Sequence, residues 1–207
     1  MRKSLRLARQ ALTLSQQDTA ANRLLALVRD QAFFRNAQQI AFYSAIDGEL
    51  DPGLLLELAL SEGKSCFLPV ITSSMSEERG PEESGTNKQE MMSFAPYESS
   101  TQLSAGRYGI AEPPLPGQAI SPADFDLVLV PLVGFSADCF RLGMGKGFYD
   151  RTFSFKISNR SSQPFLLGLA HECQLLEGFP VQSWDVQLDA VATAEKIHRP
   201  HTARAEC

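Results

Sequence analysis

A strand, a capped helix and a second strand in succession restrict the fold of this chain most strongly. Residues 38–45 (QQIAFYSA) and 66–71 (CFLPVI) are short apolar runs typical of buried strands. Between them, Asp51 as N-cap, Pro52 at the first helical position and Gly63 after the end predict a helix through LLLELALSE. This order predicts a β-α-β unit, whose crossover should be right-handed in a parallel sheet.

Further apolar runs extend this unit into one sheet. Before the first strand, a basic segment at 2–12 has partial helical periodicity, and a second helix is predicted with Ser15 as its N-cap. With 207 residues, the chain has the usual length of one domain. We therefore expect an α/β fold, a single three-layer α/β/α domain over 1–207 with a mainly parallel sheet. The further strands are predicted at 91–96, 126–133, 165–170 and 190–194.

Two segments lack the apolar periodicity that a core requires. Residues 73–90 are rich in Ser, Gly and Glu, which predicts a mobile surface loop. A flexible tail is expected at about 198–207, where a proline interrupts any helical face.

Composition and charge argue against several classes of partner. The chain has 19 basic and 24 acidic residues, a net charge of -5, so overall electrostatics do not favour nucleic acid or an anionic membrane. No apolar run approaches the roughly 18 residues of a membrane span, and no apolar signal core follows the N-terminus, so a cytoplasmic protein is expected. Any anionic ligand must then bind at a local basic site. The widely separated cysteines, expected to be free thiols, are Cys66, Cys139, Cys173 and Cys207.

A glycine-rich segment carries the clearest chemical signal. Residues 141–151 read RLGMGKGFYDR and follow the apolar run at 126–133. Alternating glycines let backbone N–H groups turn toward one centre, and a helix starting near Tyr149 would add its positive end. Arg141 and Lys146 supply cations for phosphates, while Asp150 offers a carboxylate to Mg²⁺. The segment therefore predicts a nucleotide triphosphate site.

The glycine spacing belongs to none of the common phosphate loops. It matches neither G-x-x-x-x-G-K-[ST] nor G-x-G-x-x-G. On spacing alone, a flexible turn is the simpler interpretation. The cations before and within the loop, with the Tyr-Asp-Arg sequence after it, favour phosphate binding instead.

These residues resemble a known enzyme family. V-P-L-V-G-F followed by R-L-G-M-G-K-G-F-Y-D-R is similar to the signature of the 5-formyltetrahydrofolate cyclo-ligase family, in which this loop binds ATP. The family's other motifs occur in the same order, and Lys146 stands where many members have glycine. They are the basic start at 2–6, Glu49 after the first strand, Y-G-I-x-E-P at 108–113 and D-x-x-[LV]-D at 185–189.

The resemblance implies an activity in one-carbon metabolism and a set of site residues. The activity is the ATP- and magnesium-dependent cyclisation of 5-formyltetrahydrofolate to 5,10-methenyltetrahydrofolate, with release of ADP and phosphate. Catalytic roles fall to Arg141, Lys146 and Tyr149, folate binding to Glu49 and Tyr108, and magnesium binding to Asp150 and Asp189. The implied ATP-binding residues are Arg2, Lys3, Arg6, Arg141, Leu142, Gly143, Met144, Gly145, Lys146, Gly147, Phe148 and Tyr149.

Each assignment has a simpler alternative that the sequence leaves open. The N-terminal cations could be solvated charges on a frayed end, Glu49 an exposed acid before a helix, and Tyr108 a turn residue. Asp150 could pair with Arg151. For the whole chain, the rivals are a phosphosugar isomerase or acyl-CoA enzyme of similar architecture, and a non-catalytic folate or nucleotide binder. We expect a monomer whose partners are small molecules, with no nucleic acid and no membrane.

Overall fold

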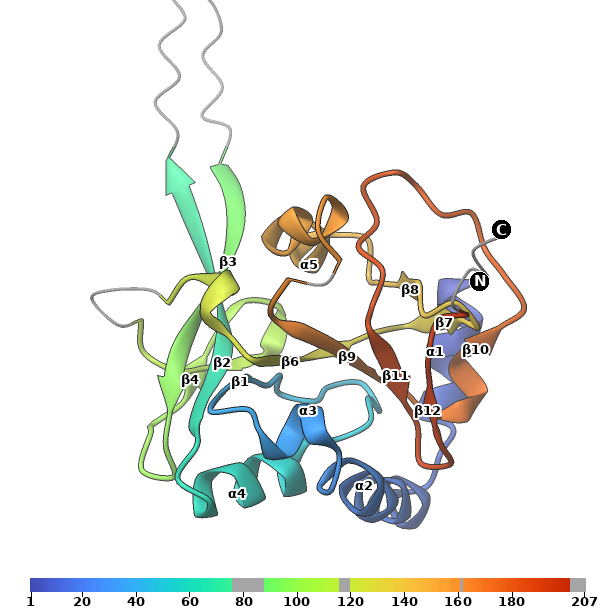
Figure 1. Ribbon diagram of the computed structural model, residues 1–207, viewed down its shortest axis with the longest axis horizontal. Coiled ribbons are helices and arrows are strands. Elements are labelled where there is room, and N and C mark those ends of the chain that lie inside the picture. Colours follow the sequence, from blue (N-terminus) through green and yellow to red (C-terminus); the bar gives the residue numbers. More distant parts are fainter. Residues whose placement is uncertain (76–87, 116–119, 161, 202–207) are drawn as a thin grey trace, which may run out of the picture.

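The computed structural model describes residues 1–75, 88–115, 120–160 and 162–201. Within these ranges a seven-stranded sheet has the order β12-β11-β9-β6-β1-β2-β3 (Figure 1). Its strands are β1 (Gln39–Ala41), β2 (Ser65–Met75), β3 (Lys88–Tyr97), β6 (Leu127–Pro131), β9 (Phe165–Leu169), β11 (Ala190–Ala192) and β12 (Ile197–His198).

Parallel pairing dominates this sheet. β1 pairs in parallel with β2 and β6, and β9 with β6 and β11, while the edge strands β3 and β12 are antiparallel. The predicted α/β class with a mainly parallel sheet is therefore confirmed. β3 is antiparallel because β2 and β3 form a hairpin rather than a helical crossover.

The hairpin corrects the boundaries of the predicted loop. Ser73 pairs with Glu90 and Met75 with Lys88, so both ends of the 73–90 segment are strands. Hydrogen bonds between paired strands satisfy the backbone N–H and C=O groups whatever the side chains are. A segment of polar residues can therefore form strands, and its composition did not reveal them. Residues 76–87 lie outside the described residues. The predicted tail begins inside β12, and 202–207 also lie outside the described part.

Helices cover both faces of the sheet. α2 (Leu14–Val28), α3 (Ala32–Arg35) and α4 (Gly53–Ser61) lie on one face, and α5 (Phe148–Thr152) on the other (Figure 1). Thr13 rather than Ser15 caps α2, because Thr13 and Gln16 exchange hydrogen bonds in a capping box. Pro52 rather than Asp51 is the N-cap of α4, although the Asp51 carboxylate still accepts a hydrogen bond from Gly53 N at 2.9 Å. None of the helices in the described ranges is long and apolar enough to cross a membrane.

The N-terminal helix α1 (Arg2–Gln10) docks beside a small second sheet. This sheet has the order β10-β7-β8, formed by β10 (Leu175–Leu176), β7 (Gly134–Ser136) and β8 (Arg141–Leu142). A Cβ at Gly134 would lie 2.8 Å from Leu5 Cδ1, so glycine permits the close approach of helix and strand. The remaining short elements are β4 (Ser104–Ala105), β5 (Ala111–Glu112), η1 (Arg107–Gly109), η2 (Pro122–Asp124), η3 (Ser154–Ile157) and η4 (Glu172–Gln174).

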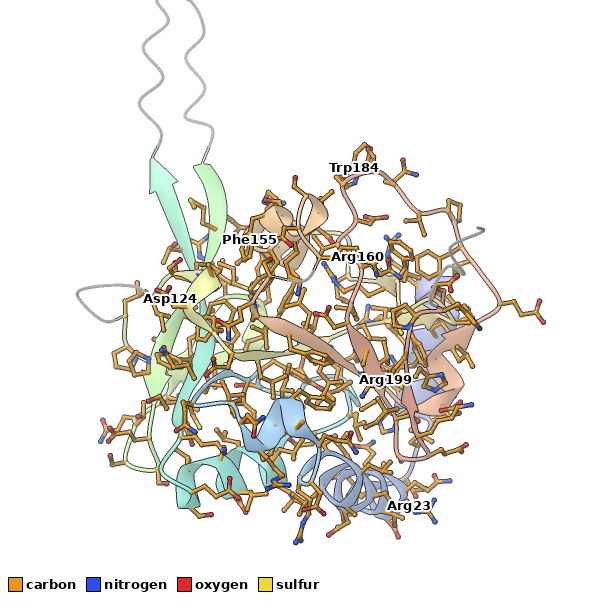
Figure 2. The ribbon with its side chains drawn as sticks, viewed as in Figure 1. Arg23, Asp124, Phe155, Arg160, Trp184 and Arg199 are labelled. Atoms are coloured by element: carbon orange, nitrogen blue, oxygen red, sulfur yellow. The ribbon has the colours of Figure 1, made fainter. Side chains whose placement is uncertain are left out.

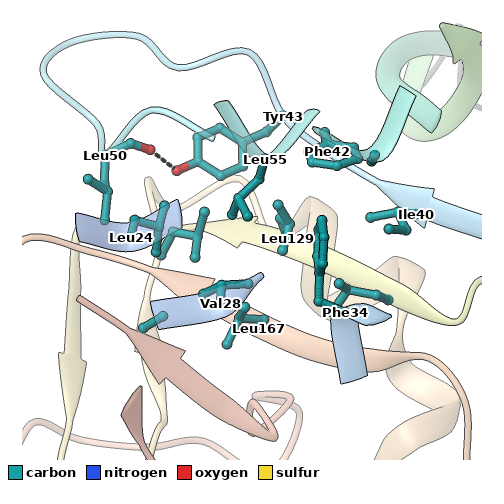
Figure 3. Packing of buried hydrophobic residues seen from close by; sticks show 14 of the residues in the cluster. Leu24, Val28, Phe34, Ile40, Phe42, Tyr43, Leu50, Leu55, Leu129 and Leu167 are labelled. Atoms are coloured by element: carbon teal, nitrogen blue, oxygen red, sulfur yellow. Dashed lines mark hydrogen bonds between the residues drawn. The ribbon is translucent and has the colours of Figure 1, made fainter. Parts of the chain in front are cut away.

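Apolar side chains fill the space on both faces of the sheet. On the α2 and α4 face, Leu24, Leu55 and Leu129 are buried together, and the buried Tyr43 donates its hydroxyl proton to Leu50 O (Figure 3). Burying each such large side chain contributes about 1.5–3 kcal/mol. The opposite face is packed with aromatic rings, among them Phe94, Phe125 and Phe153. This packing fixes the strand ends that carry the site.

Candidate active site

A pocket of about 1050 Å³ opens at the carboxyl ends of β1 and β6. Ligands of α/β proteins commonly bind at this edge of the sheet. Its walls come from α1, the loop after β1, the glycine-rich loop, the β2–β3 hairpin and the segment 179–185. On that last segment, Trp184 is 64% exposed at the rim, on the chain that arches beyond the sheet (Figure 2).

The glycine-rich loop connects β8 to α5 in a backbone shape that favours glycine. Gly145 has φ +95° and Gly147 φ +65°, values that L side chains rarely adopt. Arg2 Nε donates to Gly143 O at 2.8 Å, which ties the start of α1 to this loop. As predicted, a helix starts beside Tyr149, directly after Gly147.

Arg141 is a buried cation with an unused donor. Its side chain is 6% exposed, and Nη2 lies 2.7 Å from Asp150 Oδ2. The two groups are close enough for an ion pair but not aligned for a hydrogen bond, so Nη2 has no hydrogen-bond partner among the described residues. A buried guanidinium in this state is suited to an anionic ligand.

Tyr149 and Tyr108 each lie under one of the loop's cations. Arg141 Cζ is 5.4 Å from the centre of the Tyr149 ring, and burial raises the pKa of this phenol well above its usual range. Tyr149 therefore stays protonated and supports Arg141 from below. Lys146 Nζ lies 5.3 Å from the centre of the Tyr108 ring, whose hydroxyl donates to Glu90. Lys146, which the resemblance assigns to ATP, is thus in contact with Tyr108, which it assigns to folate.

The loop after β1 presents a largely buried acid. The Glu49 side chain is 10% exposed and accepts a hydrogen bond from Ile46 N at 3.2 Å. Burial raises the pKa of Glu49, and the nearby Arg9 opposes this rise, with its Nη2 3.4 Å from Glu49 Oε1. The alternative of an exposed acid is wrong, since Glu49 faces the pocket from a buried position.

Two residues of the predicted site lie elsewhere. Asp189 lines a separate pocket near α3, and its Oδ2 accepts from Lys156 Nζ at 2.8 Å and from Leu166 N at 2.7 Å. Lys3 is exposed and outside the pocket lining, because one step along a helix turns a side chain by about 100°. The site residues that do line the pocket are Arg2, Arg6, Glu49, Tyr108 and all of 141–150.

Sequence reasoning missed Arg9 and Asp185. Arg9 follows Arg2 and Leu5 at helical spacing, and this i, i+3, i+7 pattern could have placed it on the buried face of α1. Asp185 is the first acid of the D-x-x-x-D motif and lines the same pocket as Asp150. Val186 N, the next backbone amide, donates to Asp150 Oδ1 at 3.2 Å.

The acids of the pocket fit a magnesium ion held mainly by phosphate. Among the described residues, no three His, Cys, Asp or Glu side chains gather as a metal cluster. Mg²⁺ on a nucleotide needs only one or two protein carboxylates, because phosphates and waters complete its octahedron. Asp150 and Asp185 line the pocket of the glycine-rich loop and suit that role, whereas Asp189 lines a different pocket.

Comparison with known proteins decides the family. Residues 1–194 match the sequence model of the 5-formyltetrahydrofolate cyclo-ligase family. The chain belongs to this family. The 5-formyltetrahydrofolate cyclo-ligase of Escherichia coli K12 is 34% identical over 194 residues, which cover 93% of this chain and 98% of that protein. The cyclo-ligase of Haemophilus influenzae is 32% identical over 190 residues, covering 91% and 92% of the two chains.

A solved structure of the cyclo-ligase family has the same fold. The NMR structure of 5,10-methenyltetrahydrofolate synthetase from Aquifex aeolicus aligns with a TM-score of 0.75 at 26% identity, covering 99% of this chain and 93% of that one. These matches confirm the family that the glycine-rich segment and its companion motifs indicated. The protein is therefore an enzyme of the cyclo-ligase family.

Proposed function

We propose that this protein cyclises 5-formyltetrahydrofolate to 5,10-methenyltetrahydrofolate while ATP is converted to ADP and phosphate. One observation carries the proposal: a single pocket contains both the loop with the buried cation Arg141 and the buried acid Glu49. The pocket volume of about 1050 Å³ lies at the upper end of the usual range of ligand pockets, as a site for two substrates requires. The family match supports the same reaction.

The chemistry requires activation of a poor leaving group. The oxygen of the 5-formyl group attacks the γ-phosphorus of ATP, ADP leaves, and N5 carries a formyl-derived iminium phosphate. N10 then adds to the formyl carbon and loses its proton, and phosphate departs with the former formyl oxygen. Both steps depend on positioning and charge stabilisation, so no covalent nucleophile of the protein is needed.

The glycine-rich loop supplies the groups for phosphoryl transfer. Its backbone N–H groups and the buried Arg141 hold the triphosphate, and Lys146 neutralises charge that develops on the transferred group. Arg2 and Arg6 add cations from α1. Asp150 and Asp185 would hold Mg²⁺, which adds positive charge to the phosphates when bound.

Glu49 and Tyr108 form the folate side of the pocket. The Glu49 carboxylate accepts hydrogen bonds from the amino and ring N–H groups of the reduced pterin. Tyr108 lies beside the apolar wall, where the folate can pack. That wall consists of Pro69, Ile71, Met92 and Ile110. We further propose that the enzyme works as a monomer in the cytoplasm on small-molecule substrates alone.

A spectroscopic assay tests this function. The methenyl product absorbs in the near ultraviolet, so its formation can be followed with 5-formyltetrahydrofolate in the presence and absence of ATP and Mg²⁺. We expect methenyl formation only with both, and one ADP for each methenyl group. Binding of both ligands without turnover would instead indicate a non-catalytic binder. ATP hydrolysis that does not depend on the reduced folate would contradict the proposal.

A further inference from the structure

Arg9 is a fully buried cation in the wall of the pocket. Its Nε donates to Asp47 O at 2.8 Å, Nη1 to Leu132 O at 3.1 Å and Nη2 to Asp47 Oδ2 at 3.0 Å. The same Nη2 lies 3.4 Å from Glu49 Oε1. A buried guanidinium is costly unless it is fully paired, so this position demands its acidic partners.

The loop after β1 bends tightly around Arg9. Asp47 has φ +56° and Gly48 φ +73°, two successive residues in the left-handed region. A Cβ on Gly48 would lie 3.1 Å from Arg9 O, and the ring nitrogen Nε2 of His171 contacts Gly48 O at 3.2 Å. The loop is therefore built against α1 and η4, and its shape directs Glu49 to the pocket.

We infer that Arg9 is a positioning residue that holds the Glu49 carboxylate in place for the pterin of the folate substrate. The inference rests on the proposed function. Arg9 sits one turn beyond Arg6 on α1, so one helix supplies cations to the nucleotide and fixes the acid that binds folate. Arg9 itself touches Glu49 and Asp47 and acts on the ligand only through them.

Charge supports the same role. Burial raises the pKa of Glu49, Arg9 lowers it, and Asp47 raises it again. A carboxyl group accepts two N–H groups best when it is ionised, and Arg9 is the cation that favours this form. Burial lowers the pKa of His171, which therefore adds no positive charge at neutral pH. The other charged or titratable groups around Glu49 are Arg6, Asp51, Tyr43 and Tyr149.

A double-mutant cycle separates positioning from a purely structural role. Equilibrium binding of 5-formyltetrahydrofolate is measured without ATP for wild type, Arg9→Lys, Glu49→Gln and the double variant. Lysine keeps the charge but loses the fork that reaches both acids. We expect Arg9→Lys to weaken folate binding about tenfold in wild type and less than about twofold in the Glu49→Gln background.

Arg6→Gln provides a matched control. Arg6 also bonds to Asp47, with Nε 2.7 Å from Oδ2, but makes no ion pair with Glu49. Its substitution should change folate affinity by the same factor in both backgrounds. If Arg9→Lys also gives equal losses in both backgrounds, Arg9 is only structural and the inference is wrong.

A second measurement needs no Arg9 variant, in case that variant does not fold. Folate affinity of wild type should stay constant through neutral pH and fall only at acidic pH, where Glu49 gains its proton, and should be flat with pH in Glu49→Gln. Loss of wild-type affinity already at neutral pH would mean that Arg9 fails to keep Glu49 ionised. Wild type that binds no folate at any pH would instead contradict the proposed function itself.

Discussion

Two loops of the pocket, one after β1 of the large sheet and one after β8 of the small second sheet, are built in opposite ways. The loop at 46–49 is cross-linked by buried side chains, with Arg9 paired to both of its acids. The loop at 143–147 carries glycines, and its cation Lys146 rests on an exposed ring rather than on an acid. Buried ion pairs thus make the first a fixed loop, whereas the glycines give the second loop more backbone freedom.

The ligands that we propose for the two loops would explain this difference. A pterin is a rigid ring whose donors must meet a carboxylate at fixed positions, so a pre-oriented acid favours binding. A triphosphate is flexible and highly charged, and a glycine-rich backbone can turn its N–H groups toward it. The comparison predicts that substitutions in the fixed loop affect folate, and that substitutions around the glycine-rich loop affect ATP.

Arg141→Ala should give the largest effect. Arg141 is the buried cation that we assign to the phosphates, and loss of such a group lowers turnover by about 10²–10³-fold. Steady-state kinetics at varied ATP would measure this as a fall in kcat/KM for ATP. Arg141→Lys keeps the charge and should recover part of the activity. Unchanged ATP kinetics in Arg141→Ala would remove this residue from the nucleotide site.

The next largest effect should distinguish Asp185 from Asp189 by the magnesium dependence of the rate. Asp185→Asn should raise the Mg²⁺ concentration needed for half-maximal rate by about tenfold, because this acid lines the nucleotide pocket. Asp150→Asn should act in the same direction. Asp189→Asn is the matched control, because Asp189 faces a different pocket. A magnesium response in Asp189→Asn as large as in Asp185→Asn would restore the original assignment.

Asp189→Asn should instead affect stability. Its carboxylate pairs with the buried Lys156 at 2.8 Å and accepts from Leu166 N. The acid itself is 25% exposed, so we expect a loss of about 1–3 kcal/mol of unfolding free energy rather than the larger cost of a fully buried pair. Chemical denaturation would measure the unfolding free energy of Asp189→Asn. As a control, the variant should keep the kcat of wild type. An unchanged midpoint would show that this ion pair contributes nothing.

The smallest expected effects come from substituting one glycine in each loop. Gly48→Ala and Gly145→Ala both place a Cβ at positive φ, which costs about 1–2 kcal/mol of unfolding free energy. Beyond this, Gly48→Ala meets Arg9 O at 3.1 Å, whereas Gly145→Ala meets nothing within 4 Å. We expect the first to weaken folate and the second to weaken ATP, each by a few fold. Titrating each variant with folate and with ATP checks this. If each substitution weakens both ligands equally, the two loops do not serve different ligands.

The sheet and the glycine-rich loop could be predicted from the sequence because their signals are local. Apolar runs locate strands, and glycines between cations locate the glycine-rich loop. The antiparallel direction of β3 could not be predicted, since it depends on a hairpin whose polar side chains resemble a loop. Asp189 and Asp185 could not be told apart because only the register of the chain before β11 puts them in different pockets. Arg9 looked like any other N-terminal charge until the fold buried it.

The most direct test of the two-part pocket is binding of each ligand separately to Glu49→Gln. The substitution keeps the size of the side chain and removes the acceptor charge, so folate affinity should fall about tenfold or more. Calorimetric titration with a non-hydrolysable ATP analogue should give nearly the wild-type affinity, because Glu49 belongs to the loop that we assign to folate. If the ATP analogue weakens as much as the folate, Glu49 is structural or linked to the metal, and the division of the pocket is wrong.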